Sequence, residues 1–302
     1  MILESATESP YFEELKNRWQ REIELGRLQE AGVIIEQALA WAREHGDSRH
    51  VDSAICARAA VAIHLGQGED ELSCLREILL RNADPGNCRL AAYNLSIYYQ
   101  FIKNYKKSLF YARLAFDRSR HLDRLDWMAS SHNQLGNALL GESFVEQACS
   151  EYEQALGLMP DEVSIWRARI LTNLGYCRVL QNRFQEGYSL LYESLRLARR
   201  FGSKLFELVP RLDLSFAHLE TGRYRHAERQ GRIALELAEE LGQKDAIKNS
   251  LYLLGEAANL QGDIDTAHSL FVRLQRDFYP DSDYLPGFLL AVDVRKLVNL
   301  HA

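Results

Sequence analysis

The sequence predicts an all-α protein built from stacked helix–turn–helix repeats, an α-solenoid. Three observations lead to this prediction. Leu, Ala, Glu and Arg dominate the 302 residues and only 6 prolines interrupt them, which favours helix over strand. Apolar residues recur at spacings of three and four, which is the period of a helix. Small residues also recur at a long, nearly constant interval, which indicates a repeat protein.

The repeat is clearest in small residues that follow a turn residue by five positions. Gly222/Ala227 and Gly262/Ala267 are two such pairs, Gly26/Ala31 is a third, and looser copies place Ser108, Ala148 and Gly187 at the same point. Positions 108, 148, 187, 227 and 267 are 39 or 40 residues apart. The period of the repeat is therefore about forty residues.

A second landmark lies twelve positions before each of these small residues. It is a leucine followed by a small residue, as in Leu95-Ser96, Leu135-Gly136, Leu174-Gly175, Leu214-Ser215 and Leu254-Gly255. Where two helices cross closely, a side chain larger than these would push the helix axes apart. We therefore expect the two landmarks of each repeat to face each other across a helix pair.

Seven repeats are expected, starting near residues 10, 49, 88, 125, 164, 205 and 244, each with a tight turn at Gly or Asn between two helices. Ser9-Pro10 suits the first helix start, because proline is favoured at the first helical position. Pro160 and the segment 280–282 separate later repeats. Residues 287–300 are expected to form a C-terminal capping helix, since a terminal repeat lacks a neighbour. We predict one solenoid domain over residues 1–302, with the pairs filling about 10–285.

The pattern resembles the tetratricopeptide repeat. The marks of that family occur in order at Leu135, Gly136, Leu139, Ala148, Tyr152, Ala155 and Pro160, and again at Gly255, Ala267 and Phe271. The common unit of the family has 34 residues, so the chain is similar to the subclass with longer helices. The resemblance implies a right-handed solenoid that serves as a scaffold for proteins or peptides. Trp19 departs from the pattern, where the family prefers glycine, and the second repeat is out of register around Gly66 and Gly68.

Composition and motifs argue against several other functions. A net charge of −6 gives no general attraction to nucleic acid or anionic lipid. The sequence contains no run of 18 apolar residues, which is the length that a membrane-spanning helix needs. The five cysteines are never in a C-x-x-C pair, so neither a disulfide framework nor a zinc site is indicated. Phosphate-binding, dinucleotide-binding and hydrolase motifs are missing. We therefore expect no enzyme, no cofactor and no metal, and a cytoplasmic location because the N-terminus lacks the features of a signal peptide.

The candidate binding residues lie on the first helix of each pair. In proteins that resemble this one, the first helices line the concave face of the solenoid. Positions three before and one after the small residue of the leucine landmark share a helix face, and further positions lie one turn along. The candidate contacts on this face are Tyr93, Ile97, Asn133, Asn137, Thr172, Tyr176, Phe216, Tyr252, Glu256 and Asn259.

Two interpretations of this aromatic and amide-rich face remain open. Asparagine offers a donor and an acceptor to the backbone of an extended peptide, and tyrosine supplies rigid contact area. Alternatively, the same side chains only pack or hydrate the neighbouring first helices. The first interpretation makes the protein a non-enzymatic scaffold for a protein or peptide. The alternative function is a peptide-sensing regulatory module without its own DNA-binding domain, acting through a partner protein.

A basic cluster offers a second possible docking surface. Arg196, Arg199, Arg200 and Lys204 gather at the end of one second helix. Cations are favoured near a helix C-terminus, which explains the cluster without any ligand, whereas an acidic partner would explain it by docking there. The sequence does not decide between these explanations, and it leaves homo-oligomerisation open.

Overall fold

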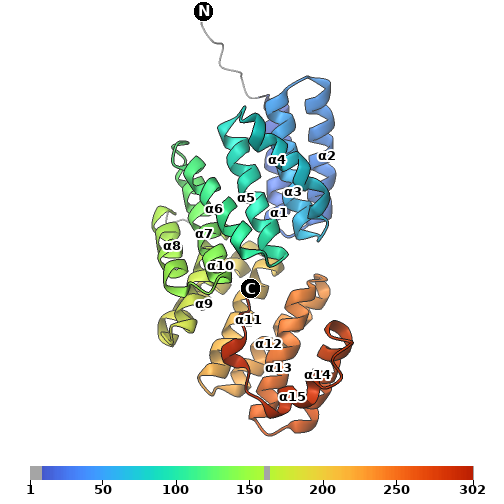
Figure 1. The fold of residues 1–302 in the computed structure, drawn as a ribbon, viewed down its shortest axis with the longest axis vertical. Coiled ribbons are helices and arrows are strands. Elements are labelled where there is room, and N and C mark those ends of the chain that lie inside the picture. The colour runs from blue at the N-terminus through green and yellow to red at the C-terminus, as the bar shows by residue number, and fades with distance from the viewer. Residues whose placement is uncertain (1–8, 160–163, 302) are drawn as a thin grey trace, which may run out of the picture. The chain divides into compact units, whose positions relative to one another are not determined.

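The protein is all-α in its computed structural model, which describes residues 9–159 and 164–301 (Figure 1). The chain divides into two compact units, unit 1 with residues 1–160 and unit 2 with residues 161–302. The described residues contain helices and turns and no strand. The predicted all-α fold of stacked helix pairs is confirmed. That all pairs form one domain stays a prediction, and the expected break at Pro160 lies outside the described residues.

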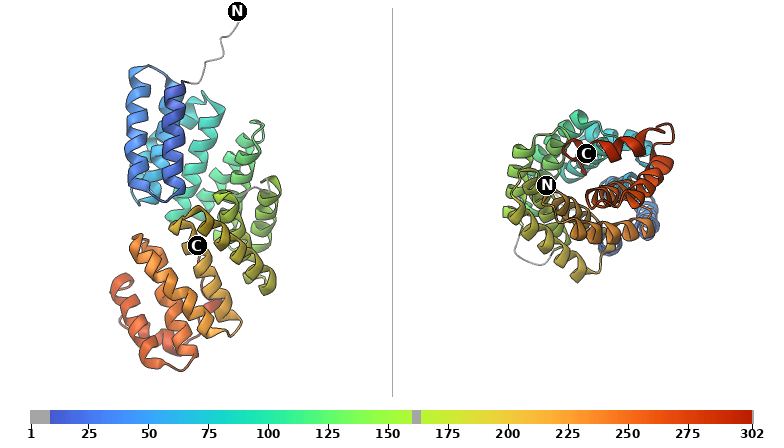
Figure 2. Two further views of the ribbon diagram at one scale, coloured as in Figure 1. Left: turned by 180° about the vertical axis from the view of Figure 1, so that it is seen from behind. Right: turned by 90° about the horizontal axis from the view of Figure 1, so that it is seen from below.

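Unit 1 stacks four helix pairs (Figure 2). Its helices are α1 (Pro10–Glu24), α2 (Leu28–Glu44), α3 (Ser48–His64), α4 (Leu72–Arg81), α5 (Pro85–Phe101), α6 (Tyr105–Ser119), α7 (Leu125–Gly141) and α8 (Val145–Leu158). A 3-10 helix, η1 (Gly68–Glu71), precedes the short α4. This irregularity accounts for the register shift in the second repeat, because η1 occupies the positions where the second helix would otherwise begin. Gly68 packs closely against Ile63, where an added Cβ would lie 2.5 Å from Cγ1.

Unit 2 stacks three further pairs and a short terminal helix. Its helices are α9 (Ile165–Leu180), α10 (Phe184–Phe201), α11 (Lys204–Glu220), α12 (Tyr224–Glu240), α13 (Lys244–Leu260), α14 (Ile264–Phe278) and α15 (Leu285–Ala291), followed by the 3-10 helix η2 (Arg295–Leu297). In both units the odd-numbered helices up to α13 are the first helices of their pairs. The seven pairs of the described residues start within a few positions of the starts expected from the repeat.

Each turn inside a pair has the same construction. The residue two positions before the second helix takes a left-handed conformation, as Gly222 does with φ +69° and Asn182 with φ +59°. Lys103 and Ser143 hold this place in two pairs of unit 1, so the prediction of Gly or Asn at every turn was wrong there. The amide of the following residue then bonds back to the carbonyl five positions earlier, for example Arg223 N to His218 O at 2.8 Å. This is the Schellman pattern that ends helices, and glycine favours it because it lacks a Cβ.

The helices of each pair cross at the two landmarks. A Cβ added to Gly136 would lie 2.5 Å from Cε1 of the Tyr152 ring, so this ring packs directly on the backbone of α7. In the preceding pair, Ser96 and Ser108 exchange hydrogen bonds with each other's carbonyl oxygens, both at 2.9 Å. The small residues are therefore needed for close approach, as expected. Trp19, which departs from the pattern, is buried against Phe12 in the first pair.

The capping helix is shorter than predicted. α15 packs on α13 and α14 as a cap does, but it ends at Ala291, and Val292 is extended with φ −125° and ψ 122°. The prediction of a helix over 287–300 was wrong beyond Ala291. The physical reason is that the residues after α15 find partners on α9, α11 and α13. These contacts require an irregular path with a single 3-10 turn.

Candidate functional site

The candidate residues of unit 2 come together on its first helices. Tyr176 from α9 and Phe216 from α11 have ring centroids 6.0 Å apart. Tyr252 and Glu256 lie one turn apart on α13, and both are buried. We call the surface that α9, α11 and α13 form here the first-helix face. These four candidates therefore lie on the three first helices of unit 2, and their role in binding stays a prediction.

The end of the chain covers the first-helix face. We call Val292–His301 the C-terminal segment; Figure 1 shows it in red, running back past α13 towards α11. The Tyr176 hydroxyl accepts a hydrogen bond from the Leu300 amide at 2.9 Å, and the Tyr176 ring stacks on the His301 imidazole with centroids 4.2 Å apart. Asn249 of α13 donates to the Leu300 carbonyl at 3.3 Å. Both main-chain polar groups of Leu300 are thus bound by side chains of the first helices.

Acidic groups of the face meet basic groups of the segment. His301 Nε2 lies 2.9 Å from Asp213 Oδ1, and the Asp213 side chain is wholly buried. Arg295 lies 3.4 Å from Glu220 Oε1 and donates to the Leu219 carbonyl. Two of the three cationic or protonatable side chains of the segment, Arg295 and His301, therefore each meet a carboxylate from α11. Arg295 is also paired with Asp293 of the segment itself at 2.7 Å.

Burial changes the acid–base behaviour of the face. Burial raises the pKa of Glu256 to about 7, although the nearby Arg295 cation acts in the opposite direction. Burial also raises the pKa of Asp213, which the His301 imidazole partly offsets. The hydroxyl of Tyr252 and Oε1 of Glu256 are buried without a hydrogen-bond partner. The face therefore holds polar groups that the C-terminal segment does not satisfy.

Two other candidates of unit 2 have different surroundings. Asn259 of α13 donates to the carbonyl of Leu290 in α15 at 3.3 Å, so it helps to attach the terminal helix. Thr172 bonds to the Ala168 carbonyl at 3.0 Å and to Ser194 Oγ of α10 at 2.7 Å. Thr172 thus faces the second helix of its own pair, and we leave it out of the proposed ligand contacts.

The four candidates of unit 1 lie on α5 and α7. Tyr93 is half-buried beside Arg89, whose guanidinium lies 4.9 Å from the centre of its ring, and Ile97 is buried. Asn133 and Asn137 are buried on α7. Asn137 accepts a hydrogen bond from the Tyr152 hydroxyl at 2.8 Å, so part of its bonding capacity is used inside its own helix pair. We leave Asn137 out of the proposed ligand contacts for the same reason as Thr172.

The sequence reasoning missed Asp213 and Asn249. Both residues carry a signal that a wider search of the helix face would have found. Asp213 lies three positions before Phe216, and Asn249 lies three positions before Tyr252, so each shares a helix face with a predicted contact. Counting from the leucine landmark selected positions three before and one after its small residue. Asp213 lies two positions before Ser215 and Asn249 six positions before Gly255, so neither position was selected.

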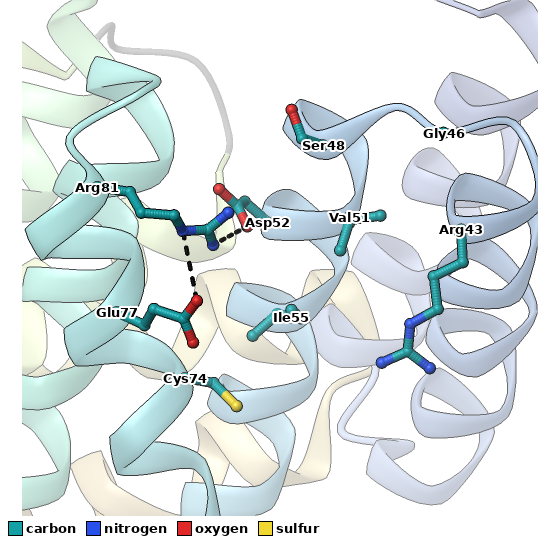
Figure 3. Close-up of a pocket in the computed structure, with 9 residues that line it drawn as sticks. All are labelled: Arg43, Gly46, Ser48, Val51, Asp52, Ile55, Cys74, Glu77 and Arg81. Carbon is teal, nitrogen blue, oxygen red and sulfur yellow. Dashed lines mark hydrogen bonds and ion pairs between the residues drawn. The ribbon is translucent and has the colours of Figure 1, made fainter.

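A pocket of about 410 Å³ lies elsewhere, between α2, α3 and α4 of unit 1 (Figure 3). Arg81 of α4 points into it and pairs with Asp52 of α3 at 2.7 Å and with Glu77 at 3.8 Å. Arg43 enters from α2 and Cys74 from α4. None of the ten predicted binding residues lines this pocket. Arg81, the arginine on α4, is already paired with carboxylates.

Two of the four residues of the basic cluster are paired with acidic residues. Arg199 lies 3.2 Å from Glu207, and Lys204 forms an ion pair with Glu240. These pairs support the explanation that the cluster stabilises helix ends and a neighbouring helix. We therefore use Arg199 and Arg200, which are exposed on α10, as control positions rather than as a site.

Within residues 9–159 and 164–301, no three His, Cys, Asp or Glu side chains lie where they could share a metal ion. None of the described helices combines the length and the hydrophobicity that crossing a membrane requires.

The fold defines the class of protein, an α-helical repeat protein with the architecture of an interaction scaffold. Residues 166–240 match the family model of the tetratricopeptide repeat. These residues hold most of the helix pairs α9/α10 and α11/α12. The resemblance to the tetratricopeptide repeat seen in the sequence is thus confirmed, with the family model matching this part of the chain. No curated protein sequence matches the chain.

Several solved structures share the fold at low sequence identity. A Rap protein complexed with Competence and Sporulation Factor is 14% identical with a TM-score of 0.73, covering 92% of this chain and 80% of that one. The apo form of RapI is 11% identical with a TM-score of 0.59, covering 96% and 85%. Aspartyl phosphate phosphatase F from Bacillus subtilis is 12% identical with a TM-score of 0.55, covering 99% and 97%. At these identities the likeness establishes the fold alone.

Proposed function

We propose that this protein is a non-enzymatic scaffold that binds an extended peptide, or an extended segment of a protein partner, on the first-helix face of unit 2. The observation that carries the proposal is the binding of a main-chain amide and carbonyl by Tyr176 and Asn249. Side chains that bond to main-chain groups hold an extended chain whatever its sequence, because every non-proline residue has the same donor and acceptor.

The remaining contacts of the face suit specific recognition. Tyr176 and Phe216 provide a rigid aromatic surface that stacks on a planar side chain. Asp213 and Glu220 provide carboxylates that select a positively charged or protonatable group. Hydrogen bonds, ring stacking and ion pairs together describe a binding surface. The five cysteines are free thiols, which supports a reducing compartment such as the cytoplasm.

The likeness to the Rap protein complexed with Competence and Sporulation Factor favours a second candidate, a peptide-sensing module that acts through a partner protein. The two candidates differ in one measurable property. A sensor changes shape when it binds its ligand, whereas a passive scaffold does not. Small-angle X-ray scattering with and without a bound peptide separates them, because only the sensor changes its radius of gyration.

The proposal is tested by selecting peptides from a random-sequence display library on the full chain and titrating the selected peptides by fluorescence anisotropy. Because the C-terminal segment uses the same two bonds, every variant is compared in a full chain that also carries Arg295→Ser/His301→Ser, which removes the contacts of the segment with Glu220 and Asp213. Tyr176→Phe keeps the buried ring but removes the hydroxyl that accepts the main-chain hydrogen bond. We expect it to weaken binding by about 0.5–1.5 kcal/mol, which is about twofold to twelvefold. Asn249→Ala should weaken binding by a similar amount.

The control is the double substitution Arg199→Ala/Arg200→Ala on α10, which should leave peptide binding unchanged. Circular dichroism must show parental helicity in every variant. Full-strength binding by both Tyr176→Phe and Asn249→Ala, or loss of binding only in the arginine variant, would place the binding surface elsewhere and refute the proposal.

A further inference from the structure

The C-terminal segment contacts the first-helix face as a bound peptide would. It follows α15 through only three residues, 292–294, before Arg295 reaches Glu220 and the Leu219 carbonyl. Six positions further, His301 reaches Asp213 and stacks on Tyr176. The segment thus spans the face from α13 to α9 with main-chain bonds and two charge-selective contacts.

The segment fits the face incompletely. Leu297 is 84% exposed and Val292 is 42% exposed, so much of its apolar surface contributes nothing to the contact. Beneath it, the Tyr252 hydroxyl and Oε1 of Glu256 have no hydrogen-bond partner although both atoms are buried. A buried polar atom without a partner is unfavourable. A ligand with donors at these points would therefore make bonds that the segment does not make.

The segment gains from being attached to the same chain. A tethered group meets its site at an effective concentration in the millimolar range, so a set of modest contacts keeps the face occupied. An external ligand must then compete, and its apparent dissociation constant rises in inverse proportion to the fraction of open face. A segment that occupies the face nine-tenths of the time weakens external binding tenfold.

We propose that the C-terminal segment is a built-in competitor for the first-helix face, and that the external ligand is a basic peptide whose two positive side chains replace Arg295 and His301 against Glu220 and Asp213. This inference rests on the proposed peptide-binding function and names both the chemistry of the ligand and the device that controls access to it.

The test uses a fluorescently labelled peptide with the sequence of residues 292–301 and an amidated C-terminus. It is titrated against the parent chain and against the full chain with Arg295→Ser/His301→Ser, in which the attached segment has lost both charge-selective contacts. We expect the variant to bind the peptide at least tenfold more tightly than the parent does. A peptide with Arg295→Ser and His301→Ser should lose at least tenfold in affinity for the same variant.

The matched control is His268→Ser/Arg276→Ser, which removes the same residue types from exposed positions on α14. It should bind the labelled peptide as weakly as the parent does. Adding Asp213→Asn to the variant should weaken peptide binding, because the imidazole loses its charged acceptor.

A second measurement avoids substitutions. In the unmodified chain, the Leu300 amide is protected by the Tyr176 hydroxyl. Saturating the chain with the unlabelled peptide should therefore speed hydrogen exchange in residues 295–301. The exchange is measured by mass spectrometry of the C-terminal proteolytic fragment. This fragment extends before residue 292, so its mass separates it from the added peptide.

Equal peptide affinity of the parent and the variant, with unchanged hydrogen exchange, would overturn the inference and make the segment a permanent part of the fold. The two proposals fail separately. If library-selected peptides bind through Tyr176 but the segment peptide does not bind the variant, only the built-in competitor is refuted. If neither kind of peptide binds, the peptide-binding function itself is refuted.

Discussion

The crossing of α7 and α8 makes the sharpest test of the repeat architecture, through the substitution Gly136→Ala. In a helix, glycine to alanine normally stabilises by about 0.5–1 kcal/mol. At this position the new methyl group would lie 2.5 Å from Cε1 and 2.8 Å from Cδ1 of Tyr152. Real side chains do not approach so closely, so the ring or the helix must move.

The Tyr152 ring has little freedom to move. It is fully buried, and its hydroxyl donates to Asn137 on the same helix as Gly136. Overpacking of this kind costs about 1–3 kcal/mol, and displacing the ring also loses a hydrogen bond worth about 0.5–1.5 kcal/mol. After subtracting the gain in helix propensity, we expect the free energy of unfolding to fall by about 1–3 kcal/mol.

Gly32→Ala is the matched control, since Gly32 lies inside α2 of the same unit and an added Cβ would meet nothing within 4 Å. It should stabilise by about 0.5–1 kcal/mol. Urea unfolding followed by intrinsic fluorescence suits the comparison, because Trp19, Trp41 and Trp127 are three of the four tryptophans and all lie in unit 1. If the two variants have the same urea midpoint, the helix-crossing argument is refuted.

Three further predictions concern stability. Ala148→Arg, at a fully buried crossing point, should lower the free energy of unfolding by at least about 1–3 kcal/mol, and an unchanged melting curve contradicts the assigned crossing. Ser143→Gly should stabilise by about 1 kcal/mol, because Ser143 has φ +65° and glycine adopts that conformation without strain; a lower urea midpoint would contradict this. The raised pKa of Glu256, about 7 in the folded chain, means that the folded state binds a proton more tightly than the unfolded state, so stability should fall as pH rises from about 4.5 to about 7. Glu256→Gln should reduce this fall in stability; Arg295 and Asp293 are the charged groups near the carboxyl. If the variant shows the same pH dependence of stability as the parent, Glu256 is not the group responsible.

The sequence by itself determined the repeat architecture, because the features that encode it are local. A turn residue, a small residue five positions later and a leucine landmark twelve positions earlier all belong to one helix pair. Their spacing therefore recurs along the sequence at a constant interval of about forty residues. The tight turn at Asn182 and the close approach of the helices at Gly136 were both predictable in this way. The first-helix positions of Tyr176 and Phe216 follow from the same counting.

Only the tertiary structure decided what lies on that face. The bond from Arg295 to the Leu219 carbonyl joins residues 76 positions apart, and the bond from Leu300 to Tyr176 joins residues 124 positions apart. No periodic pattern records such contacts, because the C-terminal segment is not a repeat and its partners lie on three different helices. Helix propensity favoured one continuous helix over 287–300, because it depends only on residues that are close in the sequence. The chain leaves the helix after Ala291 because Asp213, Glu220 and Tyr176, assembled by the fold, bind it in an irregular conformation.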